Sequence, residues 1–362
     1  MHNYLSLVRA ALWGTPASWP VEQTESLLRL NVQQGTGALV FPAVLVQEDI
    51  PSAVRAQMKS VCMSTIQQHV HLGHMLSMAW SAMKQADIQV VLMKGAGLAA
   101  FYPEPQMRQW GDIDLFVGAQ QYHPACAAMR ATFPDALKFD EELDHYKHYN
   151  LIADGVSIEI HRVTVSLPHP LDERRYARFE QYGMSHAERR TVSGVEVMIP
   201  EATFNALLIM LHSWEHMTTM GASVRQLCDL TLLMHHYAGQ LDAPRLKHYL
   251  RALRLMDVWQ LYMWMAVNYL GLPKDEALFY TDSIADRARR LMTDLLAGKM
   301  VAPKATKPAP KGRIARKWHT MQERMANARR IAAYSPSYAR HMAESIWLSG
   351  LGRLFAKDRH WE

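Results

Sequence analysis

The segment 108–117, RQWGDIDLFV, constrains this chain more than any other stretch. Apolar and acidic residues alternate within it with a period of two, which is typical of a short β-strand. Alternate residues of a strand share a face, so Asp112 and Asp114 are expected to point the same way while Ile113 and Leu115 pack on the other side. The segment therefore predicts a strand that carries a pair of neighbouring carboxylates.

Two carboxylates this close repel each other, and burying either one without a partner is costly. A bound divalent cation removes both problems, because hard cations take carboxylate oxygens and substrate phosphates as ligands. The alternative is an edge strand with two ordinary surface acids. The spacing D-x-D alone does not separate these interpretations, since so short a motif often occurs by chance.

A second predicted strand, 156–162, offers a third carboxylate. Asp154-Gly155 separates it from the candidate strand 148–153 and is a strong signal for a two-residue hairpin turn. Glu159 and His161 share one face of this strand, which could lie beside the D-x-D strand. Glu159 is either a third metal ligand or a solvent-exposed hairpin residue. His161 either orients an acceptor or acts as a base, or it is a hydrogen-bonded structural histidine.

The remaining pattern divides the chain into five parts. Residues 1–86 read as a helical region that ends in one long helix from residue 52, and strands concentrate in 87–200, with further candidates at 88–95 and 193–200. Helical periodicity returns over 201–298. A Pro- and Lys-rich linker over 299–318 then leads into a helical tail over 319–362, with a break near Ser335-Pro336.

The net charge of +5 conceals an asymmetry between body and tail. Residues 299–362 hold 14 basic and 4 acidic residues, whereas the other 298 residues hold 25 basic and 30 acidic ones. A basic pI is therefore weak support for nucleic-acid binding by the folded body. The tail is expected to dock on the acidic body; an anionic membrane surface, an acidic partner and nucleic acid are the alternatives.

The chain has three widely separated cysteines, no evident signal peptide and no uninterrupted apolar stretch long enough to span a membrane. These features argue against a disulfide framework or a zinc ribbon and favour a cytoplasmic protein without a transmembrane segment.

Three segments together resemble a family of bacterial nucleotidyltransferases in the DNA polymerase β-like superfamily. They are KGAGLAAFYPEPQMRQWGDIDLFV, IEIH and LLIMLHSWEHMTTMGASVRQLCDLTLLM, and the resemblance covers roughly 22–272. It implies an α+β fold in which a small mixed sheet is flanked by N-terminal and C-terminal helical regions, with 87–200 as the nucleotidyltransferase core. It also implies Mg²⁺- or Mn²⁺-dependent transfer of a nucleoside monophosphate group from a triphosphate such as ATP. The acceptor could be a small molecule, a sugar phosphate, a peptide or a protein.

The resemblance also implies roles for the carboxylates. Asp112 and Asp114 would hold two metal ions, and Glu159 would complete the ion that activates the acceptor. Two ions about 4 Å apart can stabilise both the attacking and the leaving oxygen of an in-line displacement.

The phosphate-binding residues implied by the resemblance lie upstream and within the same segment. Lys94 and Arg108 would bind the β- and γ-phosphates, because cations neutralise their charge. Gly95 and Gly97 would let backbone N–H groups approach a phosphate. A polar patch is expected to face the cleft from the following helices, made of His216, Arg225 and Asp229.

The chain departs from the superfamily in one place that matters. Gly95-Ala96 stands where Gly-Ser is usual, which removes a hydroxyl from the triphosphate site. This departure motivates a second hypothesis, a non-catalytic nucleotide sensor or scaffold. A D-x-D nucleotide-sugar glycosyltransferase is a third, less favoured one. The HSWEH segment, 212–216, also fits an H-x-x-E-H zinc pattern, but no third ligand is indicated.

Overall fold

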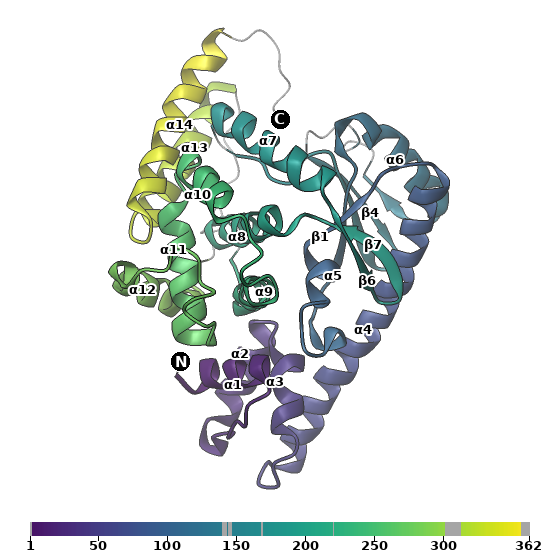
Figure 1. Ribbon diagram of the computed structural model, residues 1–362, viewed down its shortest axis with the longest axis vertical. Coiled ribbons are helices and arrows are strands. Elements are labelled where there is room, and N and C mark those ends of the chain that lie inside the picture. The colour runs from purple at the N-terminus through teal and green to yellow at the C-terminus, as the bar shows by residue number, and fades with distance from the viewer. Residues whose placement is uncertain are drawn as a thin grey trace.

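The fold is α+β, as predicted, with a small mixed sheet set among helices (Figure 1). The computed structural model describes residues 2–139, 143, 147–167, 169–219, 221–300 and 313–355. Five strands form the main sheet in the order β1-β2-β5-β4-β3. They are β1 (Val91–Met93), β2 (Asp112–Phe116), β3 (Leu137–Lys138), β4 (His148–Ala153) and β5 (Val156–His161).

The register of this sheet brings the predicted carboxylates together. Strands β2 and β5 are parallel, with Asp114 opposite Glu159, and every other neighbouring pair is antiparallel. The hairpin β4-β5 turns at Asp154 and Gly155, whose φ angles of 48° and 75° both lie in the left-handed region. Such angles are those of a type I′ turn, which explains why Asp-Gly signalled the hairpin correctly.

One face of the sheet is apolar and covered by helices. Side chains of α4 (Ser52–Gln85) and α6 (Gly118–Thr132) share a core with the isoleucine and leucine side chains of β2 and β5. The long helix predicted from residue 52 is thus confirmed, and its C-terminal half belongs to the core of the sheet. The carboxylates, which alternate with these apolar residues, occupy the opposite face.

Strands β3 and β6 (Glu188–Val192) and helix α7 (Pro170–Ser185) escaped the sequence analysis. Strand β6 pairs with the predicted β7 (Val195–Ile199) as a separate hairpin through Ser193 and Gly194, both at positive φ. Helix α7 connects β5 to this hairpin. The charged, weakly alternating sequence ERRTV hid the strand, because Val192 is its one buried residue.

Helices make up the rest of the described chain (Figure 1). The N-terminal ones are α1 (His2–Trp13), η1 (Val21–Gln23), α2 (Thr24–Gln33) and α3 (Gly37–Val44). Two short ones, α5 (Lys94–Ala99) and η2 (Pro105–Met107), lie between β1 and β2. The C-terminal ones are α8 (Ala202–Thr219), α9 (Val224–His236), α10 (Ala243–Ala252), α11 (Met256–Met265) with a π-helical continuation Ala266–Leu270, η5 (Asp282–Ile284), α12 (Ala285–Leu296), α13 (Arg313–Ile331) and α14 (Pro336–Phe355).

The tail contacts the helical body where it is described. The break predicted near Ser335-Pro336 is present between α13 and α14. Tyr334 donates a hydrogen bond to Asp294 over 2.8 Å, and Ser335 donates one to Asp257 over 2.8 Å. Residues 301–312 of the predicted linker lie outside the described residues. None of the described helices has the length and hydropathy needed to cross a bilayer.

Candidate active site

Four charged or ionisable side chains converge on the polar face of β2 and β5. Asp112 and Asp114 come from β2, Glu159 comes from β5, and Lys94 opens α5 immediately after β1. The Nζ atom of Lys94 lies 2.6 Å from Oδ1 of Asp114, and only 9% of the lysine and 1% of the aspartate side chain is exposed. These four residues and His161 are called the carboxylate cluster below.

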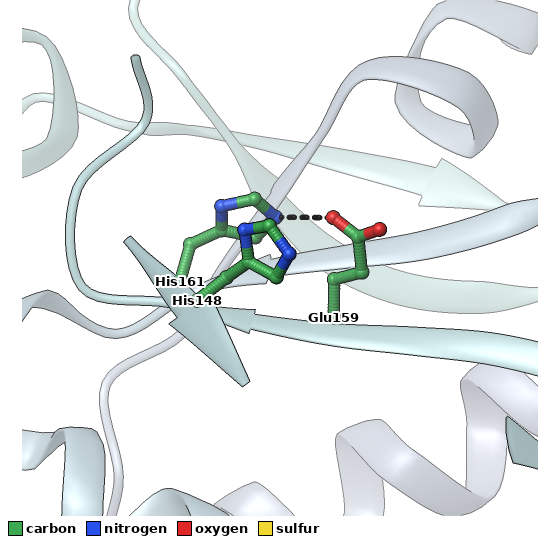
Figure 2. Close-up of side chains that lie close together, drawn as sticks. All are labelled: His148, Glu159 and His161. Atoms are coloured by element: carbon green, nitrogen blue, oxygen red, sulfur yellow. Dashed lines mark hydrogen bonds and ion pairs between the residues drawn. The ribbon is translucent and has the colours of Figure 1, made fainter. Parts of the chain in front are cut away.

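His161 links two of the three carboxylates, Asp114 and Glu159, and Figure 2 shows its hydrogen bond to Glu159. Its Nε2 atom lies 2.9 Å from Oδ1 of Asp114 and 3.1 Å from Oε2 of Glu159. The side chain is completely buried, and Nδ1 has no hydrogen-bond partner among the described residues. The sequence prediction that His161 shares a face with Glu159 therefore holds, and the histidine orients both acids.

The cluster holds charge that its surroundings only partly balance. Repulsion by Asp114, together with burial, raises the pKa of Asp112 from 3.8 to about 6. Burial alone would raise the pKa of Asp114 as well, but Lys94 and His161 outweigh it and hold that pKa well below its usual range. The pKa values of the two aspartates are thus shifted in opposite directions, upward for Asp112 and downward for Asp114.

The basic members of the cluster respond in the opposite sense. Burial alone would lower the pKa of Lys94, but Asp114 and Glu159 outweigh it and raise that pKa. Burial would also lower the pKa of His161, and its hydrogen bonds to the same two acids outweigh that effect. Both side chains are therefore stabilised in their cationic forms, as counter-ions to the carboxylates.

The donor set fits a hard divalent cation. Oδ2 of Asp114 is buried and has no hydrogen-bond partner among the described residues, and Asp112 has a pKa raised by its acidic neighbour. An oxygen left without a partner and a repelled carboxylate are both relieved by a cation with oxygen ligands. These two features make Asp112 and Asp114 suitable ligands for such a cation.

A second possible metal-binding group shares Glu159. The ligand atoms of His148, Glu159 and His161 lie within 4.8 Å of one another, and among the described residues no other such group of three is found (Figure 2). The ring centroids of the two histidines are 5.0 Å apart. His148 was missed by the sequence analysis. Counting outward from the turn at Asp154-Gly155 pairs it with His161, so the hairpin signal contained the information.

The backbone is unusual where the phosphates would approach. Lys94 has a φ of 51°, a left-handed conformation that L-residues rarely adopt and that often marks functional sites. A Cβ atom on Gly95 would lie 3.7 Å from Nη1 of Arg108, and one on Gly97 would lie 3.3 Å from a methyl carbon of Ile199. Gly95 is therefore the glycine that borders Arg108, whereas Gly97 permits close packing of α5 on β7.

Arg108 is engaged in a buried ion pair. Its Nε and Nη2 atoms donate to the two carboxylate oxygens of Asp229 on α9 over 2.8 and 2.7 Å. Tyr102 donates a further hydrogen bond to Asp229 over 2.7 Å. Nη1 donates to the carbonyl of Gln109 over 3.2 Å and keeps a second N–H, on the side of Gly95. Asp229, which was predicted in the polar patch, thus holds Arg108. The ion pair of Arg108 with Asp229 is called the arginine pair below.

The other two residues of the predicted patch lie in different places. The guanidinium group of Arg225 donates to the carbonyl oxygen of Gln109. Burial lowers the pKa of Arg225, and the positive charge of Arg108 lowers it further. His216 packs edge-on against His212, with the ring centroids 4.3 Å apart. Burial lowers the pKa of His216, and the positive charge of Lys94 lowers it further. No third ligand joins these two histidines in the described part of the chain, so the zinc pattern is not supported.

A polar cavity opens beside the D-x-D strand. It has a volume of about 300 Å³ and includes Gly111, the residue before Asp112, in its wall. The lining comes from α2, α4, α9 and the segment before β2: Val32, Gln33, Gly35, Gln68, Gln109, Trp110, Gly111, Ser223 and Arg225. Amide side chains here offer both donors and acceptors to a ligand.

Comparison with known proteins agrees with this geometry. A model of a family described as uncharacterised nucleotidyltransferases matches residues 20–271. A solved structure, of an antigenic nucleotidyltransferase-like protein from Paracoccidioides brasiliensis, is 15% identical, with a TM-score of 0.31 over 52% of this chain and 86% of that chain. No curated protein matches the sequence. The structural similarity is too low to carry an argument, but the family match covers most of the chain. The chain therefore belongs to this family of nucleotidyltransferases.

Proposed function

We propose that this protein transfers a nucleoside monophosphate group from a nucleoside triphosphate to an acceptor. The observation that supports it best is the gathering of Asp112, Asp114 and Glu159 on one face of two parallel strands, with a buried lysine beside them. The buried Asp114 and the partly buried Asp112 and Glu159, with two cationic neighbours, are poorly explained by a structural role, because unbalanced charge inside a protein destabilises a fold.

Asp112, Asp114 and Glu159 would hold Mg²⁺ or Mn²⁺. Such an ion, when bound, neutralises charge on the transferring phosphoryl group and lowers the pKa of an attacking hydroxyl. His161 orients Asp114 and Glu159 through Nε2, which we assign as a positioning role. Because its protonated form is stabilised, it is poorly suited to accept a proton at neutral pH.

Phosphate binding is assigned to the segment that begins α5. Lys94 is the buried ammonium group nearest the aspartates, and the free N–H of Arg108 lies on the side of Gly95. Lys94 thereby offers the triphosphate a cationic hydrogen-bond donor in place of the serine hydroxyl that Gly95-Ala96 lacks. The cavity beside Gly111 would receive the part of the ligand that extends beyond the aspartates.

The experiment is to incubate the protein with each labelled triphosphate and Mg²⁺ and to measure pyrophosphate release and nucleotide incorporation, with a chelator as control. Turnover that Mg²⁺ supports and the chelator removes would establish the activity. Tight triphosphate binding without turnover would favour the sensor hypothesis instead. Lys94→Ala should weaken triphosphate binding much more than monophosphate binding, and equal losses would place Lys94 outside the phosphate site.

A further inference from the structure

A strongly basic pocket lies away from the carboxylate cluster, between α7 and α10. Its volume is about 810 Å³, and five of its eight lining residues are cationic. They are Arg175 and Arg178 on α7, Lys247 and Arg251 on α10, and Arg254 just after α10; Pro244, His248 and Ala252 complete the lining. No carboxylate belongs to the lining, although the body of the chain carries more acids than bases.

Of the five cations of the pocket, Arg175 alone has a carboxylate partner among the described residues. The rings of Phe179 on α7 and Tyr249 on α10 stack beneath them with centroids 4.1 Å apart, which locks the two helices together. Asp172 contacts Arg175 over 3.2 Å and also binds His341 of α14. No other described carboxylate forms an ion pair with a cation of the pocket.

This arrangement costs stability that a solvated surface could avoid. Arg175 with Arg178, and Lys247 with Arg251, are like-charged neighbours one helical turn apart, and each such pair destabilises a helix by about 0.2–0.5 kcal/mol. Arg254 has a φ of 57° at the position after the helix C-terminus where glycine is the usual residue. Three unfavourable placements in one pocket indicate that positive charge is required there.

We propose that this pocket binds the phosphate backbone of a single-stranded nucleic acid. Lys247 and Arg251 lie four positions apart on α10, about 6 Å along the helix axis, so they can contact successive phosphates of an extended strand. Arginine predominates, and its guanidinium group matches phosphate geometry.

Other polyanions fit the pocket less well. An anionic membrane surface needs apolar side chains to insert beside the cations, and Pro244 and Ala252 are the apolar residues of the lining. A small anion is bound best in a closed site, whereas the cationic side chains here are all exposed to solvent. An extended polymer that contacts several exposed cations at once suits the geometry, and its binding would be strongly salt-dependent.

The test is the affinity of the full-length protein for a fluorescent single-stranded oligonucleotide of about 20 residues, measured by anisotropy over a salt series. If four cations contact phosphates, raising the salt from about 50 to about 200 mM should weaken binding about fifty-fold. The double variant Arg178→Glu/Arg251→Glu should weaken binding at least tenfold and lower the slope of log Kd against log salt by about 1.4.

The matched control is Arg29→Glu/Lys59→Glu, which makes the same charge change at exposed positions on α2 and α4. This control should bind the oligonucleotide nearly as well as the unchanged protein. Because every variant keeps the basic tail, the comparison also accounts for any contribution of the tail to binding. Equal losses in the two double variants, or none in either, would overturn the proposal. So would tighter binding to duplex DNA, to inorganic polyphosphate or to phosphatidylserine vesicles than to the single strand. Unchanged thermal unfolding will verify that the variants are folded.

Discussion

Two groups of charged side chains, the arginine pair and the carboxylate cluster, contain Arg108 and Asp112, which are only four positions apart in sequence, yet they are built on opposite principles. The arginine pair of Arg108 and Asp229 matches one cation with one anion through two parallel hydrogen bonds. The carboxylate cluster sets three acids against Lys94 and His161, and it leaves Oδ2 of Asp114 without a partner in the described structure.

The two groups differ in charge balance. Balanced buried pairs hold their segments in place, and removing one member leaves the other uncompensated. A cluster with surplus negative charge is less stable alone and gains from binding a cation. Replacing Asp112 and replacing Asp229 by a neutral residue should therefore have opposite effects on stability, and the following experiments exploit that contrast.

The largest effect is expected from Asp114→Asn, which should reduce the rate of nucleotidyl transfer at least ten-thousandfold, more than ~5 kcal/mol of transition-state stabilisation. The neutral amide cannot replace a carboxylate that binds a hard cation. Initial rates under saturating Mg²⁺ provide the measurement. Asp154→Asn, a change at an exposed turn residue of the adjoining hairpin, is the control and should be silent. A wild-type rate in Asp114→Asn would refute the assignment of this residue.

Asp229→Ala should lower the free energy of unfolding by about 3–5 kcal/mol, because Arg108 would remain buried and unpaired. Urea denaturation monitored by tryptophan fluorescence measures this change. The double variant Arg108→Met/Asp229→Leu removes both charges and should recover much of the loss. If the double variant were less stable than Asp229→Ala, the ion pair could not be the reason for the loss.

Asp112→Asn should stabilise the metal-free protein at pH 7, by about 3 kcal/mol at most. The pKa of Asp112 is raised to about 6 in the folded state from 3.8, and one pKa unit corresponds to ~1.4 kcal/mol. The folded state therefore binds more protons than the unfolded state between these values, so the wild type loses stability as the pH rises through this range. The variant lacks this loss.

Thermal unfolding in the presence of a chelator, from pH 3.5 to pH 7.5, tests the Asp112 prediction. The advantage of the variant should be absent below about pH 4 and should grow up to about pH 7. Adding Mg²⁺ should reverse the order, since only the wild type retains both aspartate ligands. An advantage independent of pH would show that the repulsion from Asp114 is not its source.

The smallest effect is expected from Glu159→Gln, which should lower kcat by about 10- to 100-fold, or ~1.4–2.8 kcal/mol, with little change in nucleotide affinity. The acid is assigned to the ion that activates the acceptor and not to triphosphate binding. Steady-state rates and equilibrium nucleotide binding, measured on the same preparation, separate the two effects. A loss in kcat of less than about threefold would place Glu159 among ordinary hairpin residues.

The carboxylate cluster was largely predictable from sequence because its members are ordered by local rules. A period of two placed Asp112 and Asp114 on one face, and the Asp154-Gly155 turn placed Glu159 and His161 on a neighbouring strand. These patterns act within a few residues, so they survive without knowledge of the tertiary structure. The pairing of β2 with β5 was the one long-range step, and the resemblance supported it.

The arginine pair and the basic pocket were not predictable in the same way. Arg108 and Asp229 are 121 residues apart, and no periodicity records which cation meets which acid across such a distance. Arg108 was accordingly assigned to phosphates alone, and Asp229 to a polar patch. The pocket likewise needs α7, which the sequence analysis did not identify, to face α10. The net charge of the body concealed the pocket, because that sum combines the basic residues of the pocket with acidic residues elsewhere in the body.

Helix α4 has a consequence for how the molecule can move. It is continuous over 34 residues, about 50 Å, and Met58 near its start belongs to the helical core while Leu76 near its end belongs to the core of the sheet. Because α4 is packed into a core at each end, it cannot bend sharply at its middle without breaking several successive backbone hydrogen bonds. The N-terminal helices and the sheet are thus one frame, and the ion pair of Arg108 with Asp229 ties α9 to it as well.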